Sequence, residues 1–336
     1  MKNRPQLFFF IVVLIIMAVF PLSAQRKVTI KLASLVPENT PWGEALNRMA
    51  AEWSQATRGE VEMIIYHNGV AGDESAALRK LRGNQIQAAL LTSAGLNSIA
   101  PEIMALSYPL LIRDNNELEE VLTRLRPELD RKIQEKNYVT LAWARAGWIK
   151  IFSKAPVWTP ADLRRQKLGC NPGDLEMMQA FRAMGFQMIP LSINDILISL
   201  NSGMVEAVYI SPIAAAAGQY FGVAKNMSSL NIAPFMGAIV MNQQAWQRIP
   251  PEHRPAIQAI CKKVGAEVDG SVTGLEASAI ETMVKYGLTV NTANARQQKE
   301  WADDLAKYES ALAGPIFNKE MYQKIVNILT AYRTRQ

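Results

Sequence analysis

Short apolar stretches alternate with amphipathic ones along most of the chain. Residues 28–32 alternate apolar and polar side chains, as a half-buried strand does. Apolar residues then recur at helical spacing over 42–53, after Thr40 and Pro41, which are typical of a helix cap and a first helical position. The pattern predicts a strand followed by a helix, and this unit recurs. Further strands are predicted at 61–66, 86–92, 139–144, 149–153, 167–170, 207–210 and 235–241, and further helices at 75–82, 175–184 and 194–201.

The last third of the chain is helical over an unusual length. Residues 251–286 keep a helical pattern, although Gly265, Gly270 and Gly274 interrupt it and are points where the helix can bend or break. Strand–helix alternation with short connections predicts an α/β fold with largely parallel pairing. A long helix between two such units indicates a strut that joins two lobes, with a ligand cleft where the strand ends meet. Two further helices are predicted at 297–312 and 319–332.

The N-terminus has the pattern of an export signal. Lys2 and Arg4 precede the apolar run 7–20, and small residues follow as far as Ala24. The run is short for a membrane span, which needs about 20 residues. We therefore predict a signal peptide at 1–24, with an uncleaved anchor as the alternative, and a mature chain that is soluble outside the cytoplasm.

Composition excludes several classes of protein. The chain has 336 residues, enough for two domains, and 49% of them are hydrophobic, which excludes a disordered chain. Its 36 basic and 30 acidic residues are scattered without interleaved aromatics, so nucleic acid is not expected as a partner. Cys170 and Cys261 are isolated from each other and from both histidines, which gives no zinc motif; a disulfide and two packed thiols remain open.

Catalytic motifs are absent from the sequence. The chain has no GxSxG, P-loop, GxGxxG or HExxH pattern. The adjacent carboxylates Asp73 and Glu74, and likewise Asp303 and Asp304, are interpreted as solvated, because neighbours on a helix point in different directions. We expect a binding protein with no cofactor, metal or catalytic residue. The alternatives are a periplasmic hydrolase on an α/β scaffold and a structural protein that has lost its ligand.

Six parts of the chain form recognisable motifs: 40–45, 68–74 with 77–83, 99–102 with 107–114, 158–164, 200–207 and 241–246. In this order they resemble the solute-binding proteins of tripartite ATP-independent periplasmic (TRAP) transporters, the DctP-like family, and with the export signal they suggest a periplasmic protein. The resemblance covers nearly the whole mature chain. It implies two α/β lobes that are joined by hinge strands and a long helix and close on a ligand. It also implies membrane-embedded permease subunits as partners and allows a tetratricopeptide-repeat accessory protein.

The chain lacks the arginines with which the family binds organic acids. The family's main arginine position holds Gly169, and the second holds Ile149. A third polar contact is also lost, in the stretch 208–211. We therefore expect open space at Gly169 and an apolar lining, which suits a hydrophobic or amphipathic ligand at roughly 25 cal/mol per Å² of buried apolar surface. The alternative is an organic acid held by Arg145 or Lys150.

Nine residues form the predicted ligand site. Each of them also has a structural interpretation, such as strand core, packing, a hinge hydrogen bond or backbone geometry. Lobe I is predicted to comprise 25–146 and 236–275, and lobe II 147–235 and 276–336. The predicted site residues are Ser93, Trp148, Ile149, Gly169, Asn171, Tyr209, Ile210, Ser211 and Phe235.

Overall fold

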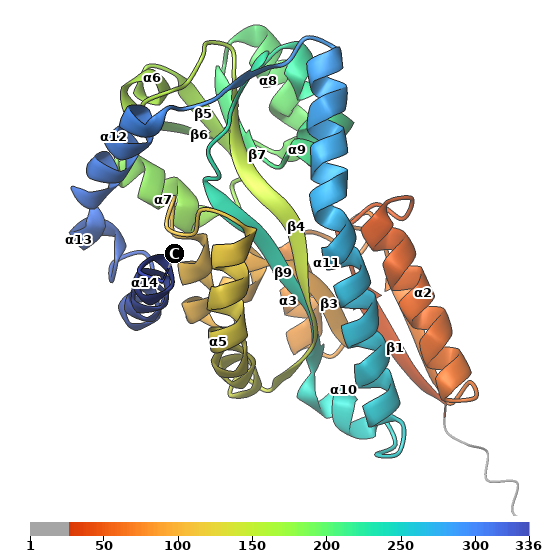
Figure 1. Ribbon diagram of the computed structural model, residues 1–336. Coiled ribbons are helices and arrows are strands. Elements are labelled where there is room, and N and C mark those ends of the chain that lie inside the picture. Colours follow the sequence, from red (N-terminus) through yellow and green to blue (C-terminus); the bar gives the residue numbers. More distant parts are fainter. Residues whose placement is uncertain (1–26, 336) are drawn as a thin grey trace, which may run out of the picture.

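One mixed sheet of ten strands runs through both lobes in the computed structural model, and the long strand β4 is the strand that pairs with neighbours in both of them (Figure 1). The structure describes residues 27–335, so the predicted signal peptide lies outside the described residues. The strand order is β2-β1-β3-β9-β4-β7-β5-β6, and β8 joins β4 to β10. The first lobe is built on the β2–β9 side of β4 and the second on the β7–β6 side. The α/β two-lobe fold with hinge strands and a long helix is confirmed.

The first lobe has three parallel strands, to which β9 pairs antiparallel. The first helix of this lobe begins where the sequence predicts, at the cap residue Thr40 and at Pro41. Thr40 accepts a hydrogen bond from the Gly43 amide, Pro41 occupies the first turn, and Met49 and Trp53 are buried in the core. The elements of this lobe are β1 (Val28–Ala33), α2 (Pro41–Ala56), β2 (Val61–Tyr66), α3 (Glu74–Arg82), β3 (Ala88–Thr92), α4 (Ser93–Asn97), η1 (Pro101–Ser107), α5 (Asn115–Gln134), β9 (Ala233–Asn242) and α10 (Gln243–Arg248).

The second lobe repeats the pattern on a smaller scale, with β7, β5 and β6 parallel and β4 antiparallel to β7. A separate pair of strands, β8 and β10, attaches to the end of β4. The elements are α6 (Pro160–Arg164), β5 (Lys167–Cys170), α7 (Leu175–Ala183), β6 (Gln187–Pro190), η2 (Ile193–Asp195), α8 (Ile196–Ser202), β7 (Ala207–Ile210), α9 (Pro212–Ala217), η3 (Tyr220–Gly222), β8 (Asn226–Ser228), β10 (Thr289–Asn291), α12 (Ala295–Ala306) and α13 (Glu309–Leu312).

Strand β4 (Tyr138–Ser153) corrects one expectation, because the two strands predicted at 139–144 and 149–153 are one strand of 16 residues. It pairs with β9 in the first lobe and with β7 in the second. Helix α5 was not predicted. The sequence of α5 is rich in charged residues, its apolar face is narrow, and the helix contains Pro127. The Asp114 side chain caps the first turn of α5.

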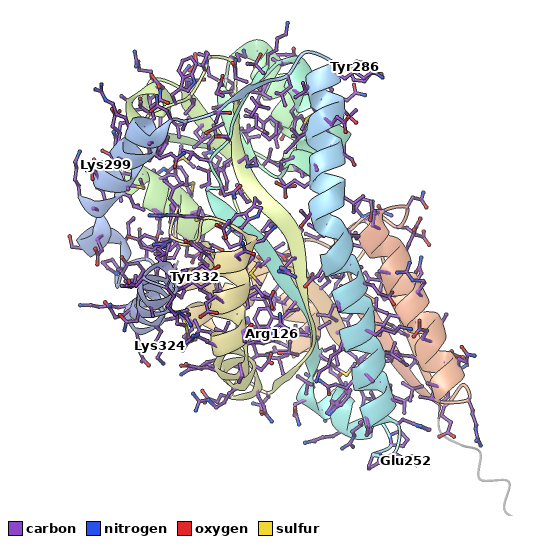
Figure 2. All side chains as sticks on the ribbon, in the orientation of Figure 1. Arg126, Glu252, Tyr286, Lys299, Lys324 and Tyr332 are labelled. Atoms are coloured by element: carbon purple, nitrogen blue, oxygen red, sulfur yellow. The ribbon has the colours of Figure 1, made fainter. Side chains whose placement is uncertain are left out.

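Helix α11 (Arg254–Lys285) is continuous over 32 residues, about 48 Å, so of the two outcomes allowed at its glycines, a bend or a break, the break does not occur. Gly265 instead allows a close approach, since a Cβ there would lie 3.3 Å from the Trp143 carbonyl oxygen. The helix packs on α2 and β4 and, farther along, on α9. Figure 2 labels Glu252 and Tyr286, just beyond its two ends, near opposite ends of the molecule in that view.

The C-terminal helix α14 (Lys319–Arg333) packs on α5 and η1, although the predicted bounds assign it to lobe II. It contributes Met321, Ile325 and Leu329 to the core of the first lobe. The lobe bounds themselves stay a prediction. Both cysteines are free and buried. No helix within 27–335 is long and apolar enough to cross a membrane.

Candidate functional site

The carboxyl ends of the parallel strands in the two lobes face the same region, which β4 and β9 cross. We call this region the interlobe junction: the ends of β1, β3, β5 and β7 with the segments that follow them, and residues 145–150 and 233–236. All nine predicted site residues lie in it. Ser93, Asn171 and Ser211 follow β3, β5 and β7, and the other residues lie on strands. Ligands of open α/β sheets bind at such strand ends.

The side chains of two predicted site residues form hydrogen bonds within the first lobe. The Ser93 hydroxyl donates to the Met236 carbonyl oxygen at 3.1 Å and so joins β3 to β9. The Trp148 side chain is buried, and its indole N–H donates to Asn115 Oδ1 at 2.9 Å. Both polar groups therefore already have protein partners.

Gly169 corrects the expectation of open space at this position. A Cβ at this position would lie 2.8 Å from Leu191 Cδ2, 3.1 Å from Val208 Cγ1 and 3.4 Å from Val205 Cγ1. The volume that an absent side chain was expected to open is thus filled by its neighbours. A side chain at this position would have to displace the Leu191 and Val208 side chains.

Half-buried apolar side chains line both faces of the strands at the junction. Ile149 packs against the cluster around α7, and Ile210 packs against the cluster that contains Leu191 and Val208. Phe235 lies half-buried on β9. Asn171 and Ser211 have local roles, because their side chains accept from the Gly173 and Ala214 amides.

Tyr209 forms a pair with a carboxylate that sequence reasoning missed. Its hydroxyl donates to Asp174 Oδ2 at 2.6 Å, and its ring stacks on Phe181 with centroids 5.6 Å apart. Asp174 Oδ1 is buried and has no hydrogen-bond partner within the described chain. Burial, with smaller contributions from the charges of Glu176 and Glu74, raises the pKa of Asp174 to about 6. Burial and the Asp174 charge raise the pKa of Tyr209 well above its usual value.

A direct contact joins the two lobes beside this pair. Asn97 Nδ2 on α4 donates to Glu176 Oε1 on α7 at 2.7 Å. On the first-lobe side, Glu74 accepts from the amide and the hydroxyl of Thr92, and burial raises its pKa against the effect of those hydrogen bonds. Glu74 is therefore not the solvated carboxylate that was expected. Asp73 is exposed and caps α3.

The second adjacent pair of carboxylates is divided in the same way. Asp304 is buried and forms an ion pair with Arg164, whereas Asp303 stays exposed. Among residues 27–335, no group of three or more His, Cys, Asp or Glu side chains is placed to hold a metal ion.

The two cations that could hold an acidic ligand differ in their surroundings. Arg145 is committed to ion pairs, with Nε 3.1 Å from Asp269 Oδ2 and Nη1 3.2 Å from Glu119 Oε2. Lys150 is buried, and its Nζ donates to the Ser229 carbonyl oxygen at 3.0 Å and to Asn231 Oδ1 at 2.7 Å. No carboxylate of the described chain lies within 4.0 Å of this ammonium group. Burial lowers the pKa of Lys150, although the charge of Glu276 acts in the opposite direction.

Two α/β lobes, two crossing strands and a long helix also characterise a known group of binding proteins. The family model of the bacterial extracellular solute-binding proteins, family 7 (DctP), matches residues 32–312. The chain belongs to this family. Membership confirms the predictions of a periplasmic location and of a TRAP-type solute receptor that is not an enzyme. It also gives the partners in general terms, a small solute and the TRAP permease.

Relatives with named ligands are similar to the chain over most of its length. The 2,3-diketo-L-gulonate-binding periplasmic protein of Escherichia coli is 24% identical over 240 residues, 71% of this chain and 73% of that protein. A C4-dicarboxylate-binding protein of Bacillus subtilis is 20% identical and covers 90% of this chain and 87% of its own length.

Solved structures show the same fold. A TRAP solute-binding protein of Chromohalobacter salexigens with bound D-glucuronate has a TM-score of 0.81 at 19% identity, covering 90% of this chain and 99% of that one. A protein of Sulfitobacter with bound β-D-galacturonate has a TM-score of 0.78 at 19% identity, with the same coverage.

Proposed function

We propose that the solute carried by this receptor is a small organic acid, bound at the interlobe junction and passed to the TRAP permease. The relatives named above bind a diketo sugar acid, dicarboxylates and uronates, which supports this class of ligand. The chain lacks the two arginines at 149 and 169, so another cation has to neutralise the carboxylate.

The main support for the proposal is the position of Lys150 and the surroundings of its ammonium group. Its backbone pairs with Ile210 at the carboxyl end of β7, within the junction. A buried ammonium group whose hydrogen bonds within the described chain go to neutral oxygens is incompletely compensated, because the more distant charge of Glu276 only partly opposes the effect of burial. A carboxylate at the junction would supply that charge. Arg145 fits the role less well, since two carboxylates already neutralise it.

A hydrophobic ligand is the second candidate. The half-buried side chains of Ile149, Ile210 and Phe235 favour it. Against it stand the ligands of the relatives and the filled volume beside Gly169. A tetratricopeptide-repeat accessory protein stays a prediction that depends on the resemblance alone.

Binding is best tested on the chain from Gln25 onward, purified without denaturant and assayed by calorimetry with D-glucuronate, D-galacturonate, 2,3-diketo-L-gulonate and C4-dicarboxylates. We expect one of these acids to bind. Lys150→Met should then weaken binding about tenfold to a hundredfold, since a hydrogen bond to a charged group contributes roughly 1.5–3 kcal/mol. Lys225→Met is the matched control, because Lys225 is an exposed lysine of the same lobe.

Organic-solvent extraction of the purified protein and mass spectrometry separate the two candidates. A stoichiometric apolar molecule, together with no binding of any acid, would overturn the proposal in favour of the hydrophobic ligand. Equal affinity of Lys150→Met and the parent for an acid would remove Lys150 from the site and leave the class of ligand intact.

A further inference from the structure

Strand β4 contains a bulge where it passes from one lobe to the other. In its pairing with β9, Arg145 lies opposite Met236 and Trp148 lies opposite Pro234. Two residues of β4, Ala146 and Gly147, therefore face the single residue Phe235. Such a two-against-one arrangement interrupts the ladder and bends the strand. Gly147 has a φ of +91°, a conformation that favours glycine.

Two carboxylates of helix α11 bind the backbone on either side of this bulge. Asp269 Oδ1 accepts from the Arg145 amide at 2.9 Å, and Glu276 Oε2 accepts from the Trp148 amide at 3.1 Å. The two acids are seven residues apart, about two helical turns, so they lie on one face of α11. The Glu276 carboxylate also packs directly on the glycine, since a Cβ at Gly147 would lie 2.3 Å from its Oε2.

The flanks of the bulge are anchored to the first lobe. The Trp42 indole N–H donates to the Arg145 carbonyl oxygen at 3.2 Å, and the Trp148 indole N–H donates to Asn115 at 2.9 Å. Beyond Trp148 the strand enters the second lobe, where Lys150 pairs with β7. Figure 1 shows α11 running beside this crossing segment. Hinge motion between lobes is absorbed by the dihedral angles of a few residues, and a glycine bulge at the crossing point can provide them.

We propose that Glu276 is a hinge-positioning residue, which holds the Gly147 bulge of β4 against α11 and thereby sets the relative position of the two lobes. The assignment is independent of which solute binds. Asp269 holds the first-lobe side of the bulge, and Glu276 holds the side that leads into the second lobe. Removing the Glu276 carboxylate frees the Trp148 amide and the glycine, so the second lobe gains a wider range of positions.

Pulsed electron paramagnetic resonance on the ligand-free protein measures this directly. Spin labels at Gln55→Cys on α2 and Lys299→Cys on α12 report the distance between the lobes. Both positions are exposed, and Lys299 is labelled on α12 in Figure 2. The native cysteines are buried, which limits their labelling. The test variant is Glu276→Ala, and Glu281→Ala, an exposed glutamate on the same helix, is the matched control.

We expect Glu276→Ala to shift and broaden the distance distribution, and Glu281→Ala to leave it unchanged. Glu276→Gln keeps an oxygen that can accept from the Trp148 amide, so it should restore the parent distribution. A lower melting temperature of Glu276→Ala with an unchanged distribution would show a merely structural role and overturn the proposal. If Glu276→Ala does not fold, Glu276→Asp is the test variant, because its shorter side chain moves the carboxylate away from the Trp148 amide. A distance distribution like that of the parent in Glu276→Asp would also overturn the proposal.

Discussion

Replacing Gly169 by alanine tests whether the space beside this residue is filled by neighbouring side chains or is open. In Gly169→Ala the new Cβ would lie 2.8 Å from Leu191 Cδ2 and 3.1 Å from Val208 Cγ1. Both distances are shorter than an ordinary contact between carbon atoms, about 3.5–4.0 Å. Overpacking of this kind costs typically 1–3 kcal/mol. The closer atom ends a leucine side chain that can rotate, so we expect a loss of about 1–2 kcal/mol in the free energy of unfolding.

Urea denaturation, followed by circular dichroism, measures this loss. Gly274→Ala is the control, because nothing lies within 4 Å of a Cβ at Gly274 and the residue is within α11. Replacing a helical glycine by alanine should stabilise the protein by about 0.5–1 kcal/mol. The two substitutions add the same methyl group and should change stability in opposite directions.

A double-mutant cycle with Leu191→Ala tests the cause. If Leu191 is the neighbour that is pushed aside, Gly169→Ala should cost less in the Leu191→Ala background, with a coupling energy of about 0.5–3 kcal/mol. A Gly169→Ala protein as stable as the parent would refute the reasoning and restore the open space expected from the sequence. By the same argument, the larger side chain in Gly169→Arg should impair folding. A failure of that variant to bind a ligand would therefore not show that Gly169 lies in the ligand site.

Two further predictions concern buried charges. Because the pKa of Asp174 is raised to about 6 in the folded protein, folding binds a proton there, and stability should fall as pH rises from about 4 to 6, by up to about 3 kcal/mol. Asp174→Asn should remove this part of the pH dependence in urea denaturation, and an unchanged profile would contradict the assignment. Arg333→Met should cost about 3 kcal/mol, because it leaves the buried Glu117 carboxylate without its cation. The exposed Arg296→Met should change stability by less than about 0.5 kcal/mol, and equal losses in the two variants would argue against the buried pair.

Local signals located most of the elements. Helix α2 begins at Pro41 with Thr40 as its cap, as the sequence predicts. This prediction is possible because a helix cap depends only on residues that are neighbours in the sequence. Helix α5 was missed since its apolar face is narrow, and the stability of such a helix comes from packing against the rest of the first lobe. The order of the family motifs was more informative than any single motif, and it led to the correct fold and transporter class.

The chemistry of the junction depended on contacts that no local pattern contains. Whether Glu74 is solvated is decided by Thr92, on a strand that the sheet brings beside it. Whether Gly169 leaves space is decided by Leu191 and Val208, which come from later in the chain.

The sequence by itself determined the strand and helix units, the export pattern and the membership of a solute-receptor family, because periodicity, caps and motifs are properties of neighbouring residues. Only the tertiary structure decided which carboxylates are buried, that Arg145 forms ion pairs while Lys150 hydrogen-bonds to neutral oxygens, and that two carboxylates of α11 accept from the backbone beside the bulge in β4. Those outcomes depend on desolvation and on distances between groups far apart in the chain, and both arise only when the two lobes pack.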